Sequence, residues 1–361
     1  MHTLYLSGNT IGEHGAFALS QAIIDDQNGI GCGLRCLHLT ANCVKGNGVK
    51  ALTRAIAMHE SRRQEIFAAN SSLFPNDENK QILNNSNDKI YSNMNPSKPK
   101  FQDYKLDELY LAGTDMGAVG CLSVSNMMLT NYSIRVLSLS HNGITDKDLT
   151  LFSQSLSRNK LVPIEVLQLS FNHLTCVGVE SLMNVVWGSK TLRDIRLDNN
   201  KIRDRGAQLV AVVLTSVDLE KVDLGFNKIT TVGIKALMKS LAENESLRSL
   251  TLSGNTLDTS ASKAVSYALA YNTNLNSLYM DNCSVGYAAQ RHVAAGVASN
   301  SSSSLRTLTG FRIGGKYNFC YIVQFFCSLS VLLSICVPFT VASISNCRDA
   351  WTSYLFGNMG K

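Results

Sequence analysis

The feature of this sequence that most constrains its fold is a motif that returns about every 28 residues. Its form is Leu-x-x-Leu-x-Leu-x-x-Asn-x-Ile, and the clearest copies begin at Leu192 and Leu219. The second anchor position falls at residues 4, 37, 109, 137, 167, 195, 222, 250 and 278. From residue 109 onward the steps are 28, 30, 28, 27, 28 and 28 residues. This period and pattern predict a solenoid in which each unit supplies one short strand and one helix.

Each part of the motif has a structural reason. Side chains of an extended chain alternate, so both leucines of Leu-x-Leu point to the core and the residue between them faces the concave surface. After the turn, as in Ile202 to Val210, a small residue followed by apolar residues at helical spacing predicts a helix. We therefore predict an α/β horseshoe of nine to ten repeats over residues 1–315, with parallel strands on the concave face and helices on the convex face.

The asparagine of the motif is predicted to be structural. It stands where the chain leaves the strand, and its amide can pair backbone groups that the turn leaves unsatisfied, in its own coil and toward the next. Thr114 and Cys283 take this position in two repeats. The turn asparagines are Asn9, Asn42, Asn142, Asn172, Asn200, Asn227 and Asn255.

On these motifs the sequence resembles the ribonuclease-inhibitor-like branch of leucine-rich repeat proteins, also seen in the repeat regions of NOD-like receptors and in the Ran GTPase-activating protein. The resemblance covers roughly residues 1–59 and 105–315. It implies a non-enzymatic scaffold that binds a protein partner. The alternative is a GTPase-activating protein similar to the Ran type. That family usually ends its repeats in a strongly acidic segment, whereas here they end in an apolar run.

Two places depart from the repeat pattern. The step from Leu37 to Leu109 is 72 residues long, and its extra residues, at about 60–104, are polar and rich in asparagine. Such a segment cannot bury enough apolar area to offset the entropy of ordering it, so we predict a disordered insertion. At the start, no polar capping helix precedes the first repeat, which favours a truncated sequence over an edge covered by a partner.

The C-terminal tail, residues 316–361, is apolar rather than repetitive. The run from 319 to 341 carries no charge, and 17 of its 23 residues are apolar. Its length suits a transmembrane helix, and the basic residues before it predict cytoplasmic repeats anchored to an intracellular membrane. The rival hypotheses are a gene-model artefact, since the codons of residues 315–317 can contain a splice-donor-like sequence, and an apolar cap.

Charge and cysteine usage argue against other classes of function. The net charge of +6 is spread along the chain, and its densest basic cluster, at 193–205, is interleaved with aspartates. A nucleic-acid groove would need a stripe of one sign. The ten cysteines, without a secretory signal peptide, predict reduced thiols in the cytosol. A zinc set of Cys32, Cys36, His38 and Cys43 lacks paired knuckle spacing, so neither a metal nor a cofactor is predicted. No catalytic constellation is recognisable.

The predicted binding residues follow from the strand alternation. The positions between core leucines hold Tyr5, His38, Tyr110, Ser138, Gln168, Arg196, Asp223, Thr251 and Tyr279. Aromatic and arginine side chains dominate the energy of desolvated interfaces. We therefore assign partner binding to Tyr110, Phe171, Arg196, Asp223, Phe226 and Tyr279, with Asp223 as a charge partner. Phe171 and Phe226 directly precede turn asparagines, and for them the alternative is an inward-facing spine between neighbouring coils.

Overall fold

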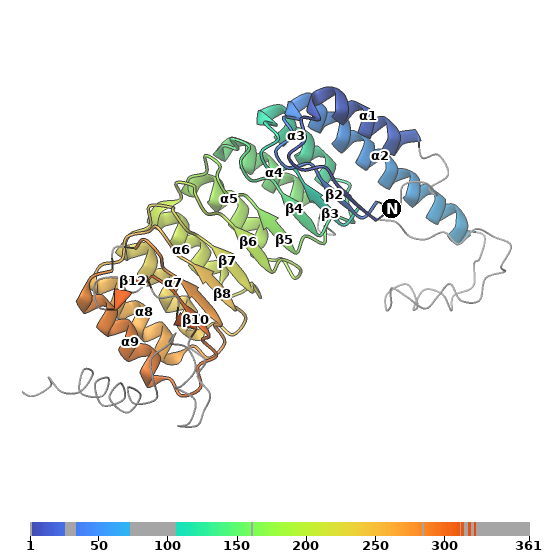
Figure 1. Ribbon diagram of the computed structural model, residues 1–361. Helices are drawn as coiled ribbons and strands as arrows, with labels where there is room; N and C mark the ends of the chain where they lie inside the picture. The colour runs from blue at the N-terminus through green and yellow to red at the C-terminus, as the bar shows by residue number, and fades with distance from the viewer. Residues whose placement is uncertain are drawn as a thin grey trace, which may run out of the picture. The chain divides into compact units, whose positions relative to one another are not determined.

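The computed structural model describes residues 2–25, 34–72, 106–159, 162–283 and 285–310, together with short strands at 312–313, 317–318 and 321–322. These residues all belong to one compact unit, Met1–Val323. Within this unit strands and helices alternate from the first repeat to the ninth (Figure 1). The second unit, Gln324–Lys361, lies outside the described residues.

The strands form one sheet whose order in space follows the order in sequence. Its parallel members are β1 (Thr3–Tyr5), β2 (Cys36–His38), β3 (Glu108–Tyr110), β4 (Val136–Ser138), β5 (Val166–Gln168), β6 (Asp194–Arg196), β7 (Lys221–Asp223), β8 (Ser249–Thr251), β9 (Ser277–Tyr279) and β10 (Thr307–Leu308). The strand β13 (Tyr321–Ile322) pairs antiparallel with β10. The strands β11 (Arg312–Ile313) and β12 (Tyr317–Asn318) form a separate antiparallel pair.

The helices form a second layer on one side of this sheet, and each described helix packs on those of the neighbouring repeats (Figure 1). They are α1 (Gly12–Asp25), α2 (Lys45–Ser72), α3 (Gly117–Met128), α4 (Asp146–Arg158), α5 (Cys176–Val186), α6 (Arg203–Val213), α7 (Thr231–Glu243), α8 (Thr259–Tyr271) and α9 (Tyr287–Ser299). Each helix follows the strand of its own repeat, so the first nine repeats each contribute one strand to the sheet and one helix to the helical layer.

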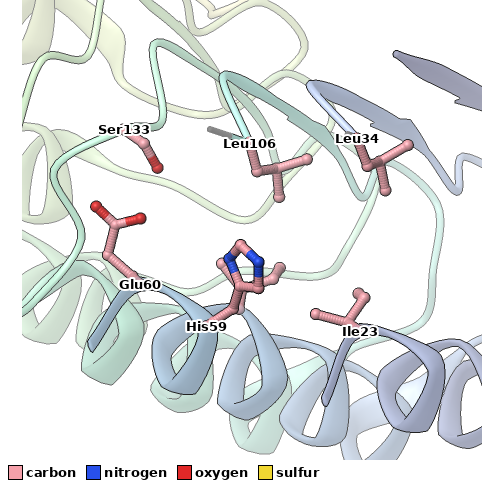
Figure 2. Close-up of a pocket in the computed structure, with 7 residues that line it drawn as sticks. Ile23, Leu34, His59, Glu60, Leu106 and Ser133 are labelled. Carbon is pink, nitrogen blue, oxygen red and sulfur yellow. The ribbon is translucent and has the colours of Figure 1, made fainter. Parts of the chain in front are cut away.

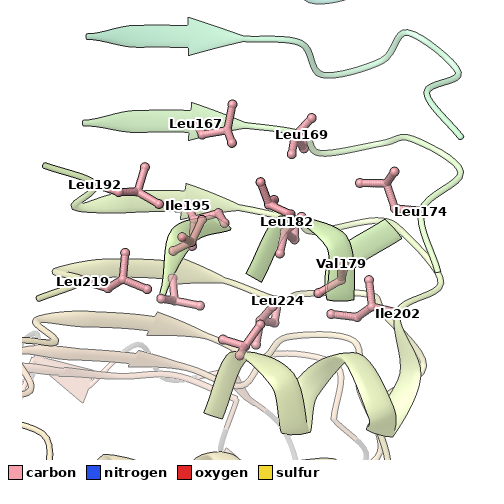
Figure 3. Packing of buried hydrophobic residues seen from close by; sticks show 14 of the residues in the cluster. Leu167, Leu169, Leu174, Val179, Leu182, Leu192, Ile195, Ile202, Leu219 and Leu224 are labelled. Carbon is pink, nitrogen blue, oxygen red and sulfur yellow. The ribbon is translucent and has the colours of Figure 1, made fainter. Parts of the chain in front are cut away.

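The leucine phase sets the core between the layers. Leu109, Leu137 and Leu167 pair directly across three neighbouring strands, and all are fully buried. The last leucine of the motif is buried in the second to eighth repeats, from Leu39 to Leu252, and Leu224 is 0% exposed. Figure 3 shows the equivalent side chains Leu167, Ile195 and Leu224 in one buried cluster with Leu182 of α5. The prediction of a repeat solenoid with strands on one face and helices on the other is confirmed.

The turn asparagines hydrogen-bond the backbone of two coils. The Asn172 amide nitrogen donates to the carbonyl oxygens of Leu169, in its own coil, at 2.9 Å and of Leu139, in the preceding coil, at 3.2 Å. Its side-chain oxygen accepts from the backbone N–H groups of Asn142 at 3.1 Å and Ile144 at 3.0 Å. Equivalent bonds are made by Asn142, Asn200, Asn227 and Asn255. The inter-coil bonds therefore run to the preceding coil rather than to the next.

A second row of asparagines, which the sequence analysis missed, lies at the helix ends. Asn272 donates to the carbonyl oxygens of Leu241 at 2.7 Å and Asn244 at 2.8 Å in the preceding coil, and accepts from the Leu275 N–H at 2.7 Å. Asn159 and Asn300 donate to the preceding coil in the same way. The available signal was their spacing, since the steps from 131 to 159, 244 to 272 and 272 to 300 are each 28 residues. Both edges of the repeat are thus tied to the preceding coil.

One predicted boundary differs from the structure. The insertion was expected to begin at about residue 60, but α2 continues through Ser72. The sequence from Arg62 to Ala69 consists mostly of arginine, glutamine, glutamate and alanine, which favour helix strongly. The composition of this part is therefore compatible with a helix. Residues 73–105 lie outside the described residues.

The candidate membrane span at 319–341 lies outside the described residues except for Tyr321–Ile322, which form β13. Across the part of the chain that the structure describes, no helix is long and apolar enough to cross a membrane. Anchoring through 319–341 stays a prediction from the sequence.

Replacing Leu224 by alanine should lower the free energy of unfolding by about 2–5 kcal/mol, because it opens a cavity in a stacked core. Urea denaturation monitored by circular dichroism measures this. The matched control is Val232→Ala on α7, a side chain that is 55% exposed, which should change stability by no more than about 0.5 kcal/mol. Equal effects of the two substitutions would contradict the assignment of Leu224 to the core.

Candidate functional site

The strand face is the outer surface of the sheet, formed by the side chains that alternate with the core leucines. Strand pairing places these side chains in rows, with His38 beside Tyr110 and Arg196 beside Asp223. Neighbouring strands lie about 4.8 Å apart, so the six steps from Tyr110 on β3 to Tyr279 on β9 span about 29 Å. The predicted binding residues on strands therefore share one surface without forming one compact cluster.

The N-terminal part of the strand face carries a stack of three rings. The ring centres of Tyr5 and His38 are 4.4 Å apart, and those of His38 and Tyr110 are 4.0 Å apart, with the latter planes nearly parallel. Tyr5 is 72% exposed. Desolvation lowers the pKa of His38, against the opposing effect of the nearby Glu108 carboxylate. The histidine is thus held flat between two tyrosines and favours its neutral form.

Beneath this stack lies a hydrogen-bonded cluster centred on Glu108. One carboxylate oxygen of Glu108 accepts from the Tyr110 hydroxyl at 3.1 Å and from the Cys36 thiol at 3.3 Å. Burial, followed by the hydrogen bond to Glu108, raises the pKa of Cys36 to about 12 and that of Tyr110 to about 12. Both groups therefore keep their protons at neutral pH.

The centre of the strand face gathers three carboxylates around one guanidinium. Arg196 pairs with Asp194 at 3.0 Å, with side chains that are 45% and 10% exposed. Asp223 lies next to Arg196 on the adjacent strand, and Asp198 accepts a short hydrogen bond from the Ser170 hydroxyl. Burial raises the pKa of Asp223 to about 6, aided by Asp198 and Asp194 and opposed by the Gly225 N–H and Arg196. The local excess of negative charge suits a cation.

The two predicted phenylalanines lie on the turn rim, which we define as the residues directly before the turn positions. Phe171 is 46% exposed and Phe226 is 47% exposed. The Phe171 ring stacks on the His141 ring with centres 4.0 Å apart. The Phe226 ring lies so close over Gly254 that a Cβ there would meet its Cδ1 atom at 2.3 Å. The alternative of an inward-facing core spine is therefore wrong.

The rim backbone explains why these rings stay outside. Residues at this position have positive φ throughout, namely Gly8, Ala41, Gly113, His141, Phe171, Asn199, Phe226, Gly254 and Asn282. Glycine adopts this left-handed conformation freely, whereas other L residues pay a steric penalty. Phe171 and Phe226 thus occupy positions where the backbone favours glycine, and their side chains leave the core row.

A row of alternating charges at the start of the strands was missed by the sequence analysis. Arg35 pairs with Asp107 at 2.5 Å, and Arg135 pairs with Glu165 at 2.5 Å. The row continues along the same motif position as Arg193, Glu220, Arg248, Asn276 and Arg306. The sequence shows this row as one residue per repeat, directly after the first leucine of the motif. The charge at that position alternates between positive and negative in most repeats. Like the turn asparagines, this row lies between coils, so it supports register more than binding.

Figure 2 shows a hollow between α1, α2 and the strand starts, lined by residues that include Ile23, Leu34, His59 and Leu106. Its volume is about 30 Å³. Pockets that hold organic ligands are about 300–1,000 Å³. The hollow is therefore not a cofactor or substrate site.

Comparison with known proteins agrees with this architecture. The family described as Leucine Rich repeat matches residues 33–52, 130–153, 188–211 and 215–238. The ribonuclease inhibitor of Mus musculus is 29% identical over 153 residues, covering 41% of this chain and 33% of that protein. That of Sus scrofa is 25% identical over 258 residues, covering 69% and 51%. The chain therefore carries leucine-rich repeats that are similar to those of the ribonuclease inhibitors.

A second group of relatives carries the same repeats in a larger protein. The NACHT, LRR and PYD domains-containing protein 14 of Mus musculus is 30% identical over 155 residues, covering 42% of this chain and 16% of that protein. The leucine-rich repeat chain thus spans only a minor part of that relative, and between a third and about half of the ribonuclease inhibitors. What this chain shares with these relatives is the leucine-rich repeat itself.

Replacing Phe226 by glycine should change the free energy of unfolding by less than about 1 kcal/mol. Relief of the left-handed conformation, about 1–2 kcal/mol, offsets the lost ring contact and the greater entropy of an unfolded glycine, about 0.5–1 kcal/mol. The control is Phe152→Ala on α4, a side chain that is 1% exposed and should cost about 3–5 kcal/mol. Thermal and chemical denaturation measure both, and a large loss for Phe226→Gly would show a structural ring.

Proposed function

We propose that this chain is a non-enzymatic scaffold whose strand face and turn rim together bind a folded protein partner. The observation that carries the proposal is the exposure of Phe171 and Phe226 on the rim. Both rings lie half outside the protein on backbone that favours glycine, so the fold itself gains little from them. A strained backbone and an exposed apolar side chain occur together at both positions. That combination supports a binding role for the two rings.

The charges at the centre of the strand face indicate which side chains of the partner would fit there. Asp194, Asp198 and Asp223 surround the single guanidinium of Arg196, and the pKa of Asp223 is raised to about 6. A lysine or arginine of the partner placed beside Asp223 would relieve this repulsion. We therefore propose that the partner inserts a basic side chain here, while the Arg196 guanidinium donates hydrogen bonds to one of its carboxylates or carbonyl groups. Buried charge pairs of this kind contribute mainly specificity.

The ends of the surface set the size of the partner. Tyr110 and Tyr279 are half-buried and lie about 29 Å apart by strand spacing, so a ligand that touches both and the Phe rim is a protein rather than a short peptide or a small molecule. These side chains project from hydrogen-bonded strands instead of mobile loops. The entropy lost when the complex forms is therefore reduced.

The relatives support the same class of ligand. The name ribonuclease inhibitor states a protein partner for two of them, and we propose a protein partner here without assigning its identity. The described thiols Cys36, Cys43, Cys121, Cys176 and Cys283 are free, which fits the cytoplasmic location that the sequence predicts.

The experiment compares two double variants of the full chain in affinity capture followed by quantitative mass spectrometry. Phe171→Gly combined with Phe226→Gly should remove a captured protein that wild type retains, because the rim loses its apolar area. The control combines Tyr267→Ala with Tyr271→Ala on the helix face, where both rings are likewise exposed, and should retain that protein. Denaturation curves establish that both variants remain folded.

The reverse outcome would contradict the proposal. If the helix-face variant loses the captured protein and the rim variant keeps it, the binding surface lies on the helices. For the protein that wild type captures, Asp223→Asn should weaken binding more at low salt than at high salt, because salt screens charge interactions near the surface.

A further inference from the structure

Three side chains with metal-binding atoms meet on the strand face between β2 and β3. Cys36 and His38 are alternate residues of one strand, so both project from the same face. Glu108 pairs with Cys36 across the two strands, although 72 residues separate them in the sequence. One potential ligand atom from each of the three side chains lies within 4.8 Å of the others.

We propose that Cys36, His38 and Glu108 form a three-ligand binding site for Zn²⁺. Thiolate, imidazole and carboxylate are the ligands that zinc takes in proteins, with bond lengths of about 2.0–2.3 Å. Tetrahedral geometry then puts ligand atoms about 3–4 Å apart. The sulfur of Cys36 and the nearer oxygen of Glu108, at 3.3 Å, already have this spacing. The site is independent of which protein the strand face binds.

The surroundings hold the ligands in place. The His38 ring lies between the rings of Tyr5 and Tyr110, at 4.4 Å and 4.0 Å, so stacking limits its rotation. The Tyr110 hydroxyl donates to the same carboxylate oxygen of Glu108 that faces Cys36. Hydrogen bonds to ligand carboxylates orient them and commonly change metal affinity by about 10–100-fold. Tyr110 is therefore a positioning residue for the site.

Zinc replaces the proton that the Cys36 thiol donates in its hydrogen bond to Glu108. On binding, the sulfur becomes a thiolate, its proton leaves to solvent, and Glu108 coordinates the ion instead of accepting that proton. Three protein ligands leave a fourth tetrahedral position for water or for a side chain of a bound protein. In contrast to the set weighed from the sequence, Cys43 is exposed beyond the turn and outside this group, while Cys32 lies outside the described residues.

The test uses the metal-free full chain under reducing conditions, titrated with Co²⁺ as a spectroscopic substitute and with Zn²⁺ in calorimetry. Wild type should bind one equivalent and show a thiolate-to-cobalt absorption band, which Zn²⁺ then abolishes. Cys36→Ser should lose the band, while the matched variant Cys43→Ser should keep it. Glu108→Gln and His38→Gln should weaken Zn²⁺ binding by about tenfold or more, and Tyr110→Phe by about tenfold.

Two results would overturn the assignment. No thiolate band on adding one equivalent of Co²⁺ to wild type would mean that the three side chains form only a hydrogen-bonded cluster, and this result does not depend on any variant folding. A band that persists in Cys36→Ser would place the metal at another cysteine. Circular dichroism of each variant establishes that a lost band reflects a lost ligand.

Discussion

The structure depends on the hydrogen bonds that turn asparagines make to the backbone of the preceding coil. A strand of three residues with a single helix cannot bury its own apolar face, so each repeat is stable only against its neighbours. Leucine packing favours this stacking but is nondirectional. The amide of Asn227, bonded to the Leu197 and Gly225 carbonyls and to the Ile202 N–H, adds direction. These bonds fix the position and the orientation of each repeat relative to the repeat before it.

The same turn geometry shapes the proposed binding surface. The residue before each turn asparagine has a left-handed backbone conformation, with positive φ. Its side chain therefore points away from the core and lies on the rim. In three repeats this residue is glycine, the choice that backbone energetics favours, whereas Phe171, Phe226 and His141 accept a steric penalty there. The rim is thus the place where this chain departs from what the fold alone requires. Departures of that kind mark function more reliably than buried positions do.

Sequence alone was sufficient for features that recur at the repeat period. The core position of Leu224 and the outward position of Arg196 follow from alternation within the motif, and both hold in the structure. The orientation of Phe226 could not be predicted, because the apolar side chain and the sign of φ favour opposite sides of the chain. The insertion was predicted to start at about residue 60, which lies inside α2, because a polar composition is compatible both with disorder and with a helix.

The contact between Cys36 and Glu108 was not recognised from the sequence for a different reason. The successive anchors Leu37 and Leu109 put both residues at one motif position, but the zinc set weighed from the sequence drew all its members from one repeat. Ligands on adjacent strands are neighbours in space at a separation that no local spacing rule contains. By contrast, the asparagine row at the helix ends recurs at 28-residue steps, so its spacing alone could have predicted it.

The central claim is that the inter-coil asparagine bonds hold the strand face as one rigid array. Native-state amide hydrogen exchange on Asn227→Ala tests it most directly, with Asn184→Ala, an exposed asparagine of α5, as the control. We predict lost protection at the amides of both coils that Asn227 joins, including those of Ile202 and Leu224, with the strands β3 and β4 unchanged. Protection that falls only at residue 227 and its chain neighbours, or equally in the control, would contradict the account.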